Sequence, residues 1–166
     1  MNAKTNERID DTQENDEQSY VDLVMEAVCK GATLKDLHGI EPEFMEGVYA
    51  YAHDFYQQGR LDDAEVFFRF LCIYDFYNAD YVLGLGAVYQ LKKNYQKAID
   101  VYALAFMLGK EDYRPMLYAG QCNLLLGRKG KGKQCFEMVI EQSEDASLKG
   151  CATVYLEGLA KSSVKT

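Results

Sequence analysis

The sequence predicts an all-α protein in which three helix-turn-helix repeats form a solenoid, with N-terminal helices before the array and a C-terminal capping helix after it. The first observation behind this prediction is a fixed period, because small residues recur 34 positions apart at Ala64, Ala98 and Gly132. The second is that each of them lies in the same pattern of large and small residues at helical spacing. The third is size, since 166 residues, 48% of them hydrophobic, suffice for one domain with a substantial core.

The repeated pattern identifies the type of repeat. The second helices read Ala64-x3-Phe68, Ala98-x3-Tyr102 and Gly132-x3-Phe136. The first helices read Val48-x2-Tyr51-Ala52-x2-Phe55, Val82-x2-Leu85-Gly86-x2-Tyr89 and Met116-x2-Ala119-Gly120-x2-Asn123. These are close to the patterns of the tetratricopeptide repeat, in which small residues let paired helices approach. The third copy departs most, with Asn123 in place of an aromatic residue and Gly132 in place of alanine.

The period also predicts where each helix begins and ends. Glycine or lysine marks the equivalent turns, at Gly59, Lys93 and Gly127. The repeats are expected at about 45–78, 79–112 and 113–144, with helices at 43–57, 61–74, 79–92, 95–108, 113–126 and 129–142. A last helix over 145–161 carries one apolar stripe, Leu148, Ala152, Tyr155 and Leu159. We expect it to cover the open end of the third repeat, as terminal elements of solenoids do.

The chain before the array has two parts. Residues 1–18 are polar and are predicted to be a disordered tail, and residues 19–161 a single domain that begins with a helical segment over 20–40. A capping box formed by Thr33 and Asp36 predicts a short helix there. The preceding helix is apolar around most of its circumference, so we predict that it contacts a second copy of the chain. The contact residues would be Tyr20, Leu23, Val24, Ala27 and Val28.

Charge and cysteine content exclude several classes of function. The formal net charge, 18 − 26 = −8, argues against direct nucleic-acid binding. The sequence has neither an apolar run long enough to span a membrane nor an N-terminal secretion signal, so we expect a cytosolic protein without membrane attachment. Five cysteines, an odd number without a C-x-x-C spacing, indicate neither disulfides nor zinc, and we expect them to pack as small apolar residues.

Candidates for catalysis are few. The two histidines, His38 and His53, stand in no metal-binding spacing, and no phosphate-binding loop motif is present. The segment GLGAVY at 84–89 lies within a predicted helix, where it cannot act as a dinucleotide fingerprint. A cysteine and a histidine brought together by the fold stay open as a nucleophile pair, although nothing local supports one. We therefore predict no catalytic residue, no metal and no cofactor.

The array does predict a binding surface. Stacked helix pairs leave a concave face lined by the first helix of each repeat, which suits an extended peptide. For Tyr49 and Tyr56 core packing stays open as an alternative, because tyrosine suits a core and a groove. By register, the expected groove residues are Tyr49, His53, Tyr56, Leu83, Ala87, Gln90, Leu117, Gln121 and Leu124.

Several longer segments carry a resemblance to a known family. They are GATLKDLHGI at 31–40, YAHDFYQQGRLDDAEVFFRFLCIYDFYNADY at 51–81, YALAFMLGKEDYRP at 102–115 and GQCNLLL at 120–126. With them the chain resembles the class II type III secretion chaperones of Gram-negative bacteria, over about residues 20–160. Within that family it looks most similar to the translocator chaperones of the Shigella and Salmonella invasion systems.

The resemblance implies a small acidic cytoplasmic chaperone that keeps two hydrophobic translocator proteins soluble until their export. It implies that a short extended segment near the translocator N-terminus lies in the groove, and that the chaperone forms a homodimer through its N-terminal helices. Some members of this family also bind an AraC-type transcriptional activator, so co-activation is a further expectation. The alternative is a scaffold or regulatory adaptor that joins folded proteins, and the two differ in whether the partner enters the groove unfolded.

Overall fold

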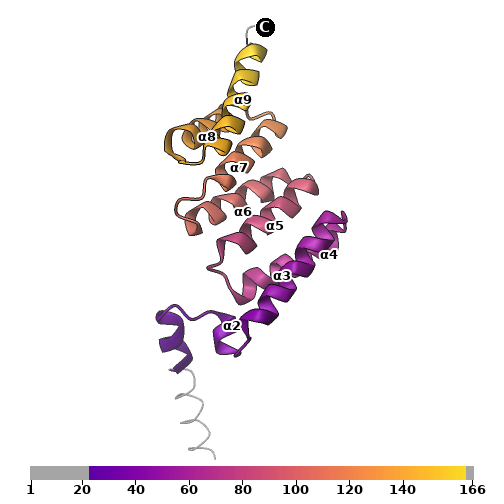
Figure 1. Ribbon diagram of the computed structural model, residues 1–166, viewed down its shortest axis with the longest axis vertical. Helices are drawn as coiled ribbons and strands as arrows, with labels where there is room; N and C mark the ends of the chain where they lie inside the picture. Colours follow the sequence, from indigo (N-terminus) through magenta and orange to yellow (C-terminus); the bar gives the residue numbers. More distant parts are fainter. Residues whose placement is uncertain (1–22, 164–166) are drawn as a thin grey trace, which may run out of the picture. The chain divides into compact units, whose positions relative to one another are not determined.

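The computed structural model describes residues 23–163, and the side chains of residues 23–161 (Figure 1). The predicted tail, 1–18, and Tyr20 of the predicted dimer contact lie outside these residues. The chain divides between Glu41 and Pro42 into two compact units. Every regular element of the described residues is an α-helix, which confirms the predicted all-α class.

The first unit contains a helix over residues 23–29 and the short helix α2, Leu34–Leu37. Thr33 precedes α2, and both its backbone N–H and its hydroxyl donate to Oδ2 of Asp36, at 2.8 and 2.7 Å. Gly31 ends the preceding helix with a φ of 90°, a conformation that favours glycine. The capping box predicted from the sequence is therefore confirmed.

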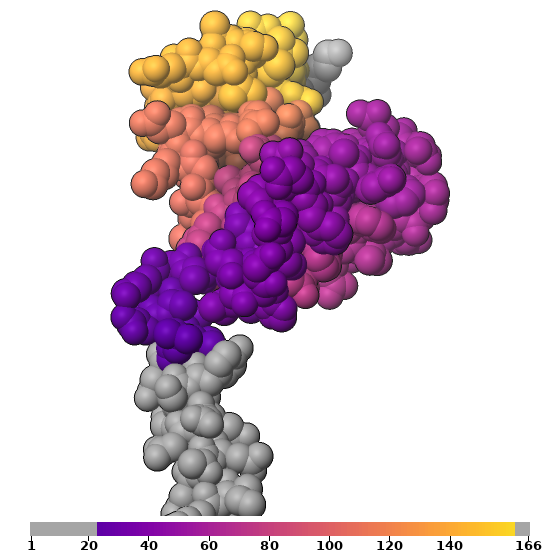
Figure 2. Space-filling view, turned by 60° about the horizontal axis from the view of Figure 1, so that its bottom comes forward, coloured from indigo at the N-terminus to yellow at the C-terminus, as the bar shows by residue number. Residues whose placement is uncertain are grey.

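The second unit begins with the six helices of the array, each of which packs against the next (Figure 1). Each predicted helix end lies within one residue of the observed end, which confirms the three helix-turn-helix repeats. In Figure 2 the helices of residues 42–163 follow one another as bands of colour in chain order. Their bounds are α3 Pro42–Gln57, α4 Leu61–Tyr74, α5 Ala79–Leu91, α6 Tyr95–Leu108, α7 Arg114–Leu125 and α8 Lys129–Gln142.

The three equivalent turns share one backbone conformation. The φ angles of Gly59, Lys93 and Gly127 are 73°, 61° and 73°, all in the left-handed region. Glycine adopts this region without the steric cost that a side chain brings, so lysine at position 93 is the strained member of the set. The period alone was enough to place these turns.

Small residues bring the paired helices together as predicted. A Cβ added to Gly86 would lie 2.5 Å from the ring of Tyr102, and one added to Gly120 would lie 2.6 Å from the ring of Phe136. Ala52, at the same position in the first repeat, is fully buried. The first helices α5 and α7 thus each accept an aromatic ring of their second helix where a larger residue would collide.

The capping helix α9, Ala146–Ser163, follows the array and packs on α8. Its start is fixed by Asp145, whose Oδ1 accepts from the N–H of Ser147 at 2.7 Å. Ala152 is fully buried, and Tyr155 stacks on Phe136 with ring centroids 4.8 Å apart. The predicted C-terminal cap is confirmed.

Candidate functional site

Two neighbouring hollows open on the face formed by the first helices α3, α5 and α7. They have volumes of about 190 and 220 Å³ and share Tyr56, Ala87 and Tyr118. We call them together the groove. The smaller hollow is also lined by Tyr49, His53, Phe68, Leu83 and Gly84, and the larger by Gln90, Leu91, Tyr102 and Gln121.

The smaller hollow is the aromatic end of the groove. The ring of Tyr49 meets His53 edge to face at a centroid distance of 4.6 Å, and His53 meets Phe68 in the same way at 5.6 Å. Gly84 makes room for this cluster, because the ring of Phe68 occupies the space that a side chain at position 84 would need. Burial raises the pKa of Tyr49, so its hydroxyl stays protonated at neutral pH. The surface offered here suits an apolar side chain.

The larger hollow is the polar end. The hydroxyl of Tyr102 donates to Oε1 of Gln90 at 2.7 Å, and Nε2 of Gln90 donates to Oε1 of Gln121 at 3.1 Å. Burial raises the pKa of Tyr102 far above its ordinary value, which keeps this hydroxyl protonated and able to donate. The three side chains come from α6, α5 and α7, so the bonds run across two repeats.

Two of the nine predicted groove residues lie elsewhere. Leu117 is only 4% exposed and belongs to the core cluster with Phe136, Val139 and Ala152, so its placement in the groove was wrong. Leu124 packs against the same cluster, and its Cδ2 lies 2.7 Å from where a Cβ of Gly132 would be. Leu117 is therefore buried in a cluster that α8 and α9 complete, whereas Leu124 is half-buried at its edge. The other seven, Tyr49, His53, Tyr56, Leu83, Ala87, Gln90 and Gln121, line the groove.

Five lining residues were missed by the sequence analysis: Phe68, Gly84, Leu91, Tyr102 and Tyr118. Phe68 and Tyr102 were assigned only to the packing between paired helices. Tyr118 closes the groove on the α7 side, with its ring 5.6 Å from that of Tyr102. The sequence held one signal for it, since Tyr118 lies 34 residues after Gly84, and a bulky residue at that place faces the groove.

Comparison with known proteins identifies the family. A tetratricopeptide-repeat family model matches residues 45–78 and 79–112, the bounds predicted for the first two repeats. The chain is similar to the chaperone protein SicA of Salmonella typhimurium, with 59% identity over 143 residues, 86% of this chain and 87% of SicA. It belongs to the class II type III secretion chaperones.

Two solved structures of a further member of these chaperones, SycD of Yersinia enterocolitica, share the fold. SycD in complex with a peptide of the translocator YopD has a TM-score of 0.70 at 26% identity, covering 75% of this chain and 98% of SycD. An alternative dimer of SycD has a TM-score of 0.68 at 26% identity, covering 75% and 97%. In that relative, the fold therefore accompanies both a bound peptide and self-association.

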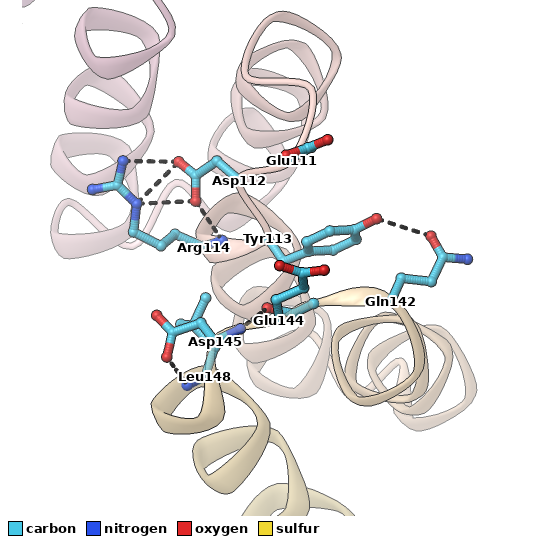
Figure 3. Close-up of a pocket in the computed structure, with 9 residues that line it drawn as sticks. Glu111, Asp112, Tyr113, Arg114, Gln142, Glu144, Asp145 and Leu148 are labelled. Carbon is cyan, nitrogen blue, oxygen red and sulfur yellow. Dashed lines mark hydrogen bonds and ion pairs between the residues drawn. The ribbon is translucent and has the colours of Figure 1, made fainter.

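A hollow of about 390 Å³ lies away from the groove, between the α6–α7 and α8–α9 connections (Figure 3). Two of its four carboxylates, those of Asp112 and Asp145, have structural partners. Asp112 Oδ2 lies 2.8 Å from the guanidinium of Arg114, which also reaches Asp80 at 3.0 Å, and Asp145 caps α9. The hydroxyl of Tyr113 donates to Gln142 at 3.0 Å. This hollow shares no residue with the groove, and its polar groups hold helices in place.

The chaperone offers little for nucleophilic or metal chemistry. Burial raises the pKa of both the Cys72 and Cys122 thiols to about 11, so neither is a thiolate at neutral pH. Cys29 and Cys151 are exposed. For these two cysteines the expected packing as small apolar core residues is therefore wrong. Within residues 23–163 no group of three or more His, Cys, Asp and Glu side chains could hold a metal ion. No helix in this part of the chain has the length and apolar character needed to cross a bilayer.

The predicted dimer contact lies in the first unit. Within that unit Leu23 and Val28 are 63% and 44% exposed, and Val24 and Ala27 are half-buried. A helix with this much exposed apolar surface is typical of a segment that another surface covers.

Proposed function

We propose that this chaperone binds an extended segment of a translocator protein in its groove and thereby keeps that protein soluble and competent for secretion. The observation that carries the proposal is the groove itself, an aromatic hollow joined to a polar one on three consecutive first helices. The peptide held by SycD supports it, because that relative shares the fold of this chain. The proposed contacts are Tyr49, His53, Tyr56, Leu83, Ala87, Gln90 and Gln121.

The shape of the groove favours an unfolded partner over a folded one. Hollows of about 190 and 220 Å³ each hold one or two side chains, and an extended strand can place side chains in both. Binding would then rest on a few apolar anchors and have little electrostatic share. A scaffold contact that used the net charge of −8 would depend strongly on salt, since exposed charge pairs are screened within about 10 Å at 0.1 M.

A synthetic peptide from the N-terminal region of the translocator tests the proposal. We expect micromolar binding, on the order of −8 kcal/mol, that changes little between low and physiological salt in isothermal titration calorimetry. The same peptide with its apolar anchors replaced by alanine should not bind. If only the folded partner binds, no linear peptide competes and salt abolishes the complex, the adaptor function takes the place of the chaperone function.

We further propose that the chaperone forms a homodimer through Tyr20, Leu23, Val24, Ala27 and Val28. The exposed apolar side chains of residues 23–28 and the dimer of SycD support this. Deleting residues 1–30 should halve the mass in light scattering and leave the helical content of the repeats unchanged. An unchanged mass would exclude this helix as the contact.

The remaining parts of the proposal are less specific. We propose a non-catalytic protein of the bacterial cytoplasm, in which residues 19–161 act as one chaperone domain. Relatives that carry the name chaperone support the non-catalytic role. Co-activation with an AraC-type regulator stays a prediction from the family resemblance.

A further inference from the structure

A directed chain of hydrogen bonds crosses the polar end of the groove. It runs from the hydroxyl of Tyr102 to Oε1 of Gln90, and from Nε2 of Gln90 to Oε1 of Gln121, over 2.7 and 3.1 Å. A side-chain amide accepts only through its oxygen and donates only through its nitrogen. The donor at the start of the chain therefore determines which way each of the two amides points.

The last amide of this chain has an unused donor. Its oxygen accepts from Gln90, and within residues 23–161 Nε2 of Gln121 donates no hydrogen bond. Gln121 is half-buried and lines the hollow of about 220 Å³. The Tyr102 side chain at the start of the chain is buried, and its hydroxyl donates to Oε1 of Gln90.

We propose that Gln121 donates a hydrogen bond from its amide to a backbone carbonyl of the bound segment, and that Tyr102 and Gln90 are positioning residues that orient it. This inference rests on the proposed function, since it presumes that an extended segment lies in the groove. It goes beyond apolar anchoring, because it adds a fixed polar contact that is independent of the bound sequence. Such a contact would set the register in which the anchors enter their hollows.

A backbone carbonyl is the acceptor that the geometry favours. An extended segment makes no internal hydrogen bonds, and one carbonyl per residue is left without a partner unless water or the groove supplies one. The side chains that line the hollow beside Gln121 are those of Tyr56, Ala87, Leu91 and Tyr118. A segment bound against them would displace water from its own backbone. A backbone carbonyl that enters this hollow loses its hydrogen bond to water. The amide N–H of Gln121 can supply a hydrogen bond in its place.

The test uses the full chain and a synthetic peptide. The peptide has the sequence of the translocator segment that co-purifies with the chaperone from the native host and is protected from protease in the complex. Gln121→Leu should weaken binding by about 3- to 10-fold, the range expected for one neutral hydrogen bond. Tyr102→Phe should weaken it by about 2- to 5-fold. The double variant should bind no more weakly than Gln121→Leu alone, because Tyr102 acts through Gln121.

Two further variants sharpen the test. In Gln90→Glu, residue 90 presents carboxylate oxygens to both Tyr102 and Gln121. The Gln121 amide should then turn its NH₂ towards residue 90 and away from the bound segment. Binding should weaken as in Gln121→Leu. Tyr113→Phe is the matched control, because it removes a tyrosine-to-glutamine hydrogen bond of 3.0 Å outside the groove, and it should bind as wild type. If Tyr102→Phe fails to fold by circular dichroism, Gln90→Glu carries the test.

Peptides in which single backbone amides are replaced by esters locate the carbonyl, since an ester oxygen is a weaker acceptor. One position should weaken binding to wild type but not to Gln121→Leu, whereas a side-chain acceptor would give no such position. Additive losses for Tyr102→Phe and Gln121→Leu, or undiminished binding by Gln121→Leu, would overturn the inference. Different results would contradict the proposed function itself: no binding of the peptide by the wild type, or undiminished binding by Ala87→Glu.

Discussion

Repeats 1 and 2 leave their inward-facing positions open, whereas repeat 3 packs two of its three corresponding residues, Leu117 and Leu124, against a core and keeps only Gln121 open to the groove. Leu83 is half-buried and lines the groove, but Leu117, which is 34 residues later, is 4% exposed between α8 and α9. Gln90 faces the larger hollow, but Leu124 turns towards Gly132. Two residues at the same place in the repeat thus have different surroundings.

The cause lies in the residues around the repeat. Leu124 packs into the space that Gly132 leaves open. At the equivalent positions of repeats 1 and 2, Ala64 and Ala98 carry a methyl group that takes up the corresponding space. Leu117 is covered by a cluster to which α9 contributes Ala152, Leu148, Leu156 and Leu159. The repeat register therefore determines which face a side chain is on, and the neighbouring helices determine whether that face is groove or core.

The largest effect should come from filling the open part of the groove. Ala87 borders both hollows, so Ala87→Glu would place a charge and added volume against an apolar anchor, at a cost of several kcal/mol. We expect the peptide to lose measurable binding in calorimetry while circular dichroism stays unchanged. Ala103→Glu, at an exposed position of α6, is the control and should bind normally. A folded Ala87→Glu variant that retains its cargo would place binding on another face.

The equivalent leucines of repeats 2 and 3 should respond in opposite ways. Leu117→Ala removes a buried side chain and should lower the free energy of unfolding by about 2–4 kcal/mol, with little change in peptide affinity. Leu83→Ala should lower it by less than about 1.5 kcal/mol and weaken peptide binding by about tenfold. Urea denaturation and titration of the same samples separate the two quantities. Equal losses of affinity would mean that Leu117 also contributes to the groove.

The smallest effect concerns the two glycines of α8, neither of which has a positive φ. Gly130 has open space around it, so Gly130→Ala should raise the free energy of unfolding by up to about 1 kcal/mol through helix propensity. Gly132→Ala would meet Leu124 at 2.7 Å and the Gly120 carbonyl at 3.1 Å, so it should gain less or destabilise. Thermal unfolding of both variants checks this. Equal stabilisation would show that Leu124 is free to move aside.

The period predicted the helices well because each repeat pairs small and large residues at fixed positions, and sequence alone records that spacing. It could not predict the placement of Leu117 and Leu124, because this depends on Gly132 of α8 and on the side chains that α9 adds. Asn123 is a further example. It occupies a buried aromatic position, where its Nδ2 donates to the Ala119 carbonyl at 2.9 Å and its Oδ1 finds no partner within the described residues. The hydrogen-bonded chain from Tyr102 to Gln121 was likewise not predictable, because its three members come from three helices.

The arrangement of α3 to α9, in which each helix packs chiefly on its sequence neighbours, has a consequence for cooperativity. An array of this kind can lose its end repeats without unfolding throughout, because stability is the sum of local terms. A strand held by α3, α5 and α7 at once would bind only when all three are folded. The stabilisation that the bound strand adds, about 2.7 kcal/mol when it is present at a hundredfold excess over Kd, would then be shared by every repeat that it crosses. The bound cargo would thus couple the stabilities of the repeats that it crosses, and the occupied chaperone would unfold more nearly as a single unit.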